Sequence, residues 1–343
     1  MAVSHSFSPK EFTCWIISDA TNAGTSGIDA SNMYQLDVDS VGYPSLNVTQ
    51  ALDVRSGVGR TFKDEDFFQD NTMRVVELGI SGTMHNDVGH NMLVKNICNQ
   101  EGSGDVSLAS GHVGSKQLYG AAVENAVSSL TVVIKSSDHT NQKSLEFPGC
   151  VVTNFTLSAD TGTEGGRYKF SATLQSGVKP DLNESSTVAG ANVYTNTTNC
   201  LFSTSSGHKI NNTSVIMNSF TATVDHPAVF SGASSTGFQT IARGAECVVT
   251  ADCQVKYDGN TKGFVNDFDS QTGSSINTAI STGNCFLITN NAKYGVQSQS
   301  AIFTNVAYSE GDIMMLDLSM KAVDDGTNAV SYTHLTLPTI YSV

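Results

Sequence analysis

Two stretches of the chain repeat one pattern of paired β-strands, and this repetition limits the folds the chain can adopt. The first comprises residues 152–158 and 165–177, and the second comprises residues 303–309 and 311–326. Each contains Thr-Asn, then a serine before a turn with an acid and glycine, then a long alternating strand closed by glycine. A chain that builds one β unit twice is more typical of a symmetric building block than of a solitary catalyst.

The composition predicts a mainly β protein. At 343 residues the chain is long enough for two domains, and 39% hydrophobic residues suffice for a core in each. Thirty glycines, six prolines and only 15% charged residues describe many strands joined by tight turns.

The formal net charge of −14 disfavours electrostatic capture of nucleic acid or of an anionic membrane. Contact with DNA would then take the form of passage rather than binding. The alternative is that the acidity only keeps the protein soluble.

The seven cysteines are scattered singly, without a Cys-x-x-Cys motif. This pattern predicts reduced, partly buried thiols, which suit a cytosol. The first twenty residues lack the apolar core of a signal peptide, and no window of the sequence reaches the length and hydropathy of a membrane span.

Residues 330–343 match one reading frame of a common transposase sequencing adapter, and Ala329 fits the codon that the adapter would complete. We therefore expect the segment from about Ala329 to be read-through that replaces the natural C-terminus, so His334 is excluded from any site. The alternative is a genuine threonine-rich strand.

The order of the strand-like segments predicts a domain duplication. Residues 214–224 stand in the second half where 45–54 stand in the first, and 247–257 stand where 75–84 stand. The segment after Gly177 is rich in turn formers and reads as a linker. The predicted organisation is an N-terminal arm (1–40), a first domain (41–178), a linker or extended loop (179–212), a second domain (213–328) and the adapter-derived segment (329–343).

Three segments are candidates for short helices: 88–98, 117–124 and, more weakly, 278–282. The N-terminal arm carries the only tryptophan, Trp15, which we expect to anchor the arm on its own domain or on a neighbouring subunit.

No pattern in the sequence predicts catalysis. The sequence lacks Gly-x-Ser-x-Gly, a Walker loop, a dinucleotide-binding glycine motif and His-Glu-x-x-His. His85 and His90, with Asp87 between them, could contribute to a metal site, but their spacing favours a solvated turn. Cys247 and Cys253 would lie too far apart along one strand to share zinc. We therefore expect no enzyme activity and no catalytic, cofactor-binding or metal residue.

Three segments resemble the tail tube (major tail) proteins of long-tailed bacteriophages. They are 44–60, with Pro44-Ser-Leu and Arg55-Ser-Gly-Val-Gly-Arg60; 149–158 together with 165–173; and 218–224, Asn-Ser-Phe-Thr-Ala-Thr-Val. These patterns are moderately specific, and the resemblance spans most of residues 40–328. It is a likeness of architecture more than of motif.

The resemblance implies two tandem tail-tube-like β-barrel or sandwich domains, each with a short flanking helix, whose sheets join those of neighbouring subunits. Such proteins stack rings into a hollow tube through which the genome passes. With two copies per chain, a trimer would imitate a hexamer, although hexameric rings remain open. The implied partners are other copies of the chain, tape-measure, tail-terminator and tail-tip proteins, and passing DNA. The implied location is the virion tail, assembled in the host bacterial cytoplasm without membrane insertion.

The long loop at 55–68 is the predicted contact between rings. Its candidate residues are Arg55, Arg60, Phe62, Phe67 and Phe68. The competing functions are those of another β-rich virion protein, such as a tail-tip, fibre or capsid decoration protein, or of an immunoglobulin-like surface adhesin.

Overall fold

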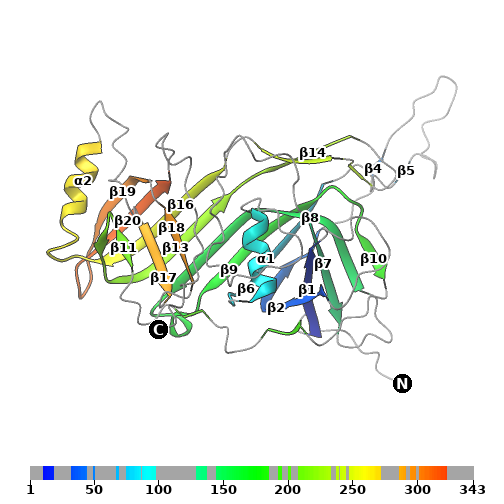
Figure 1. Ribbon diagram of the computed structural model, residues 1–343, viewed down its shortest axis with the longest axis horizontal. Helices are drawn as coiled ribbons and strands as arrows, with labels where there is room; N and C mark the ends of the chain where they lie inside the picture. Colours follow the sequence, from blue (N-terminus) through cyan, green and yellow to red (C-terminus); the bar gives the residue numbers. More distant parts are fainter. Residues whose placement is uncertain are drawn as a thin grey trace, which may run out of the picture.

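The protein is mainly β, as its composition predicts (Figure 1). The computed structural model describes residues 11–18, 32–44, 49–50, 67–68, 75–85, 87–97, 129–136, 144–184, 192–194, 200–201, 208–232, 237–238, 240–244, 247–271, 286–290, 294–298 and 301–322.

Two α-helices and twenty β-strands lie in these residues. The helices are α1 (Val88–Ile97) and α2 (Gly263–Gln271), with a 3-10 turn at Glu164–Gly166. In the first half of the chain the strands are β1 (Phe12–Ser18), β2 (Tyr34–Leu36), β3 (Val38–Gly42), β4 (Thr49–Gln50), β5 (Phe67–Phe68), β6 (Val76–Thr83), β7 (Leu130–Ser136), β8 (Ser144–Asp160), β9 (Lys169–Ser176) and β10 (Asp181–Glu184). In the second half they are β11 (Lys209–Ile210), β12 (Thr213–Ser214), β13 (Met217–Asp225), β14 (Ala228–Ser231), β15 (Thr240–Arg243), β16 (Val248–Lys256), β17 (Phe286–Asn290), β18 (Tyr294–Ser298), β19 (Ala301–Ser309) and β20 (Met315–Ala322).

The long strand β8 organises an antiparallel sheet of twelve of the described strands. Its first half pairs with β7, which leads to β1 and β2. Its second half lies between β9 and β13, so that one path runs β3-β6-β9-β8-β13-β16-β20-β19. Among the described strands β3 pairs only with β6 and β19 only with β20, so the sheet is open at these two strands. Figure 1 shows β19, β20 and α2 at one end of the long axis, with β1 and β7 toward the other.

A glycine allows β8 to change direction between its two sets of partners. Gly149 has a φ of 64°, which lies in the left-handed region that favours glycine. A Cβ atom there would lie 2.8 Å from Cγ2 of Val178. The bend lets one strand serve two differently oriented parts of the sheet.

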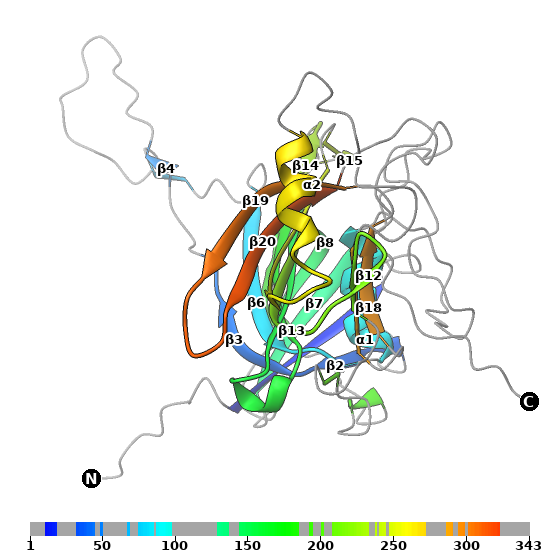
Figure 2. The same ribbon diagram turned by 90° about the vertical axis from the view of Figure 1, so that its left-hand side faces the viewer.

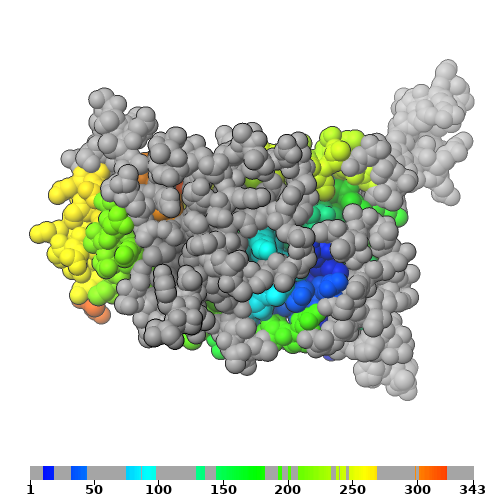
Figure 3. Space-filling model, viewed as in Figure 1, coloured from blue at the N-terminus to red at the C-terminus, as the bar shows by residue number. Residues whose placement is uncertain are grey.

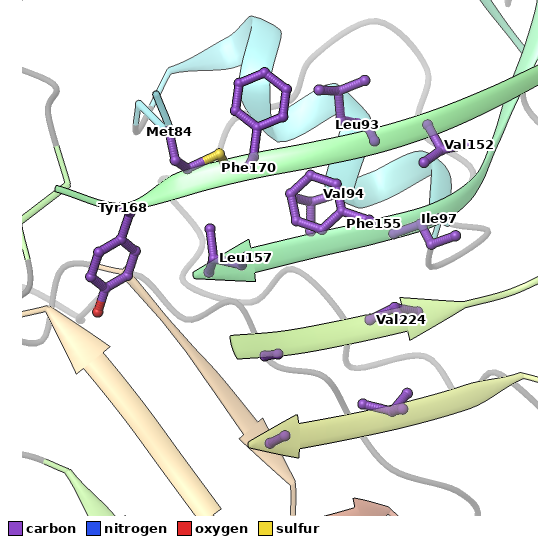
Figure 4. Packing of buried hydrophobic residues seen from close by; sticks show 14 of the residues in the cluster. Met84, Leu93, Val94, Ile97, Val152, Phe155, Leu157, Tyr168, Phe170 and Val224 are labelled. Carbon is purple, nitrogen blue, oxygen red and sulfur yellow. The ribbon is translucent and has the colours of Figure 1, made fainter. Parts of the chain in front are cut away.

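Alternation along the strands separates an apolar face from a polar one. In β8, Phe155 and Leu157 are buried, while Thr156 and Ser158, which alternate with them, are only partly buried. The apolar face forms the main core together with α1 (Figure 4). Figure 2 shows β3, β6, β20 and β19 along one side of the molecule, with α1, β12 and β18 along the other.

Both helices pack on the apolar face. Leu93 and Val94 of α1 are buried beside Phe155 and Phe170 (Figure 4). Helix α1 packs against β8, whereas α2 packs against β19. Phe264 of α2 has its ring centroid 5.8 Å from that of Phe303. In the space-filling view α2 forms one end of the molecule (Figure 3).

The structure confirms the helix predicted at 88–98, which is α1. The segments 117–124 and 278–282 lie outside the described residues, and α2 was not predicted. Residues 12–18 and 34–36, which the sequence assigned to an arm, are strands of the main sheet. The predicted linker, 179–212, contains β10 and β11.

The prediction of a solvated turn at His85 and His90 was wrong, because both side chains are fully buried. Nε2 of His85 lies 2.8 Å from Oδ2 of Asp37, and Nδ1 of His90 lies 2.8 Å from Oδ1 of Asp87. Hydrogen bonding by His85 is the main reason that the pKa of Asp37 is lowered. Imidazoles paired with carboxylates in this way can be buried at the start of α1.

Truncating Phe170 should test how far the fold depends on this core. Phe170 is buried, and its ring is stacked with that of Phe155, with the two ring centroids 6.4 Å apart. Phe170→Ala should lower the free energy of unfolding by about 3–5 kcal/mol, because it removes buried apolar surface and leaves a cavity. Urea titration measures the change. Val229→Ala, at a side chain that is 53% exposed, should change stability by less than about 0.5 kcal/mol. Equal effects of the two substitutions would contradict this assignment of the core.

Candidate functional site: two matching sheet edges

The main sheet contains one arrangement of four strands twice. We call β3, β6, β9 and β8 the first strand set, and β13, β16, β20 and β19 the second strand set. One row of directly paired residues in the first set is Val38, Gly82, Phe170 and Leu157, and the matching row in the second is Met217, Val255, Leu316 and Tyr308.

The irregularities of the two sets also match. The pairing skips Asp39 in β3 and Asn218 in β13. It skips Thr153 in β8 and Thr304 in β19, the threonines of the repeated Thr-Asn. An extra residue in a strand is a specific backbone feature, so its recurrence at two places fixes the correspondence residue by residue.

Single hydrogen bonds beyond the strand pairing agree with this correspondence. The N–H of Met84 donates to the carbonyl of Tyr168 at 2.8 Å, and the N–H of Tyr257 donates to the carbonyl of Met314 at 3.1 Å. The register thus supports the predicted match of 247–257 with 75–84. It also corrects the other predicted match: 217–221 corresponds to 38–42, and not to residues within 45–54.

The two sets are joined where β8 pairs with β13. Leu157 lies opposite Ala222, and their side chains are 1% and 4% exposed. The hydroxyls of Thr156 and Thr223 are 3.1 Å apart on the other face. The last strand of the first set thus covers the first strand of the second set.

The same positions are uncovered at the two edges that have no partner among the described strands. Tyr43 lies five residues after Val38, as Ala222 lies five after Met217, and Tyr308 occupies the place of Leu157. Tyr43 is 47% exposed and Tyr308 is 51% exposed. The edges of β3 and β19 therefore expose aromatic side chains at positions that are buried at the internal junction.

The backbone of the β3 edge is compatible with a partner strand despite Pro44. The N–H of His226 donates to the carbonyl of Thr153, and that of Thr161 donates to the carbonyl of Asn218, so even-numbered residues of β13 bond to β8. Thr223, the counterpart of Pro44, therefore directs its N–H away from β8. A proline, which lacks this donor, costs no hydrogen bond to a partner strand at this position.

Within the two strand sets, the face of the sheet opposite the core is mostly polar. Along the described strands it carries the hydroxyl and amide side chains Asn154, Thr156, Ser158, Ser171, Thr173, Gln175, Ser219, Thr221, Thr223, Thr250, Gln254 and Ser319. Its carboxylates include those of Glu77, Asp160, Asp225, Asp252 and Asp317, and its lysines include Lys169, Lys256 and Lys321. This face therefore consists mainly of uncharged polar groups, and it is weakly acidic.

Arg243 of β15 fastens the internal junction. Its Nη1 donates to the carbonyls of Val152 at 2.6 Å and His226 at 3.0 Å, and its Nη2 donates to the carbonyl of Asn96 and to its Oδ1. Nδ1 of His226 lies 3.0 Å from the carbonyl oxygen of Ile97, and burial lowers the pKa of this imidazole. The guanidinium ties the C-terminal end of α1 to β8 and to the residue that follows β13.

Trp15 is buried on its own chain, in β1. It belongs to a small cluster with Ile17, Met33 and Val133. Phe67 and Phe68 form β5, whose backbone pairs with Gln50 and Thr49 of β4.

The other predicted loop residues, Arg55, Arg60 and Phe62, lie outside the described residues. Tyr43 and Tyr308 were not predicted. The signal for Tyr308 was present in the repeat, because a tyrosine stands there where the first copy has Leu157.

The five cysteines in the described part of the chain are free thiols. Four of them, Cys14, Cys150, Cys200 and Cys253, are buried, and burial raises the pKa of Cys14 and of Cys200 to about 12. Across the described residues, no group of three or more potential ligands is placed to hold a metal ion. No helix in this part of the chain is long and apolar enough to cross a membrane.

No protein-family model matches the chain, and no curated protein is significantly similar to it.

Replacing Arg243 should loosen the internal junction. Arg243→Met should lower the free energy of unfolding by about 3 kcal/mol, because buried carbonyl groups lose a charged donor. Thermal unfolding measures the change, and Lys321→Met on the exposed face is the matched loss of one charge. An Arg243→Met protein as stable as the Lys321→Met protein would show that Arg243 does not fasten the junction.

Proposed function

We propose that the chain is a structural virion protein of a long-tailed bacteriophage, whose copies form stacked rings of a hollow tail tube for genome passage. The observation that carries the proposal is the match between the internal β8–β13 junction and the two free edges. Strand β19, the last of the second set, has the register and the bulge position of β8. Strand β3, the first of the first set, has those of β13.

The proposed contact is an antiparallel pairing of β19 in one chain with β3 in the next. By the register of the internal junction, Tyr308 lies opposite Tyr43 and Ser309 opposite Gly42. This pairing covers both tyrosines and satisfies the backbone groups of two open strands. An aromatic pair across two strands adds stabilisation of roughly 0.2–1 kcal/mol beyond the backbone bonds.

The contact is head-to-tail, since the surfaces that meet are different. A head-to-tail contact generates closed rings when its rotation closes, and open filaments when it does not. We read the two strand sets as two tandem tail-tube-like domains. On that reading three chains give six similar units in a ring. The internal junction is then the model for the three contacts between chains.

The polar face supports assignment of the tube lining. Its hydroxyl and amide groups can both donate and accept hydrogen bonds. Carboxylates outnumber lysines on this face. A weakly acidic wall repels phosphates and keeps DNA from adhering. Tape-measure, tail-terminator and tail-tip proteins would meet the tube in the virion, after assembly in the host bacterial cytoplasm.

A designed disulfide tests the register of this contact. Gly42→Cys combined with Ser309→Cys should link neighbouring chains under mild oxidation, because their counterparts Thr221 and Ser158 are directly paired. That pair makes no mutual backbone bonds, so its Cα atoms lie about 4.5 Å apart, within reach of a disulfide. A Cβ atom at Gly42 meets nothing closer than 3.7 Å. Non-reducing gels should show covalent multimers that end at the number of chains in the ring.

The matched control moves one cysteine two residues along β19. Gly42→Cys with Ala307→Cys places the thiols diagonally, at about 7–8 Å, and should give few links. Equal linking by both pairs would refute the register. Absence of linking in both, with monomers at high concentration, would refute head-to-tail assembly itself.

Deleting residues 56–66 tests the predicted contact between rings. These residues lie between β4 and β5 and outside the described part of the chain. The shortened protein should form rings linked by the cysteine pair above, but negative-stain microscopy should show no elongated tubes. Tubes of ordinary length would contradict the role of the loop in stacking.

A further inference from the structure

One residue of the segment between the two sets closes an end of the first set. The N–H of Tyr168 donates to the carbonyl of Cys200 at 2.9 Å, and the N–H of Cys200 donates to the carbonyl of Met84 at 3.4 Å. Leu201 forms an antiparallel bridge with Arg167. Cys200, Tyr168 and Met84 are each at most 1% exposed. The bridging residue therefore completes both the hydrogen bonding and the burial where β6 and β9 separate.

The matching end of the second set is open in the described residues. Tyr257 and Met314 correspond to Met84 and Tyr168, as their shared hydrogen bond shows, so Ile313 corresponds to Arg167. Met314 is 45% exposed and Ile313 is 63% exposed. Among the described residues, no backbone group bridges Met314 and Tyr257 as Cys200 bridges Tyr168 and Met84. The site combines two exposed apolar side chains with a backbone donor, the N–H of Met314, and a backbone acceptor, the carbonyl of Tyr257. These two groups correspond to the ones that Cys200 bridges in the first set.

The correspondence of β1 with β11 identifies the segment that fits this site. Ile16 pairs with Val132 of β7 and with Tyr34 of β2. Ile210 likewise pairs with Phe286 of β17 and with Thr213 of β12, so it corresponds to Ile16. Cys200 lies ten residues before Ile210, and Ser6 lies ten residues before Ile16. Phe7 then corresponds to Leu201.

In a head-to-tail ring the next chain contributes this segment. Strand β11 belongs to the half of the chain that follows the internal junction, and the residues before it reach back to the first set. Strand β1 of the next chain follows the junction between chains in the same way, so the residues before it reach back to the second set of the preceding chain. In the proposed ring, matching connections would bring an apolar residue, Phe7, opposite the exposed Ile313.

We propose that the N-terminal segment around Ser6 and Phe7 of one chain closes the open end of the second strand set of its neighbour, at Ile313 and Met314. This inference rests on the proposed head-to-tail ring, and it adds a second contact between the same two chains. Ser6 supplies the bridging backbone group, and Phe7 covers Ile313. The contact buries apolar surface that the described part of a single chain leaves in water.

Paired cysteines test the contact. Phe7→Cys combined with Ile313→Cys should give links between chains, seen as covalent multimers on non-reducing gels, while each single substitution leaves monomers. Arg167→Cys with Leu201→Cys is the positive control, since that bridged pair lies within one chain and should give a linked monomer. Phe7→Cys with Val229→Cys is the negative control, because Val229 is also more than half exposed but lies on β14.

The Gly42–Ser309 cysteine pair, measured in parallel, separates the two proposals. Links through Gly42 and Ser309 without links through Phe7 and Ile313 would overturn the N-terminal contact and leave the ring standing. Absence of both kinds of link would overturn both. Deleting residues 2–10 gives a second measurement without added thiols: the ring should dissociate at a concentration at least tenfold higher in sedimentation velocity. An unchanged dissociation concentration would also overturn the contact.

Discussion

The pairing of β8 with β13 is the interaction on which the rest of the molecule depends. Each of these strands already has a partner on its other side, β9 and β16, so their pairing converts two separate edges into the interior of one sheet. It also sets the register in which Leu157 and Ala222 are buried together. Because a slip of one residue would turn every side chain to the opposite face, this register is strongly specified. The outer edges present the same backbone pattern without a partner among the described strands.

The bulges explain how a sheet of this length keeps one apolar face. In a regular strand, successive side chains point to opposite faces of the sheet without interruption. At Thr153 the pairing skips one residue, so that Val152 and Phe155, three positions apart, both face the core. The skip at Thr304 acts in the same way between Phe303 and Val306. The repeated Thr-Asn is therefore the sequence signature of a backbone irregularity, and not of a chemical site.

The sequence predicted those features that depend on local pattern and missed those that depend on neighbours. The strand pairs around Thr153 and Thr304 were visible because apolar residues alternate there, and α1 because several apolar residues recur within ten positions. Helix α2 was missed because it has few apolar residues among polar and acidic ones, so only its packing on β19 reveals it. The burial of His85 was missed because its partner, Asp37, is distant in sequence. The exposure of Tyr43 depends on its place at an edge, which spacing alone does not show.

Joining two strand sets in one chain changes how the edges can assemble. The internal junction forms within a single molecule, at an effective concentration set by the connecting segment, and Arg243 fastens it through carbonyls from both sides. In the proposed ring, each chain would therefore arrive with one of every two junctions already made. The remaining junctions would bury Tyr43 and Tyr308, which are large enough to stabilise contact but are tolerated in water on a single chain. A weaker outer contact and a permanent inner one would allow misplaced chains to dissociate while the units within each chain stay in register.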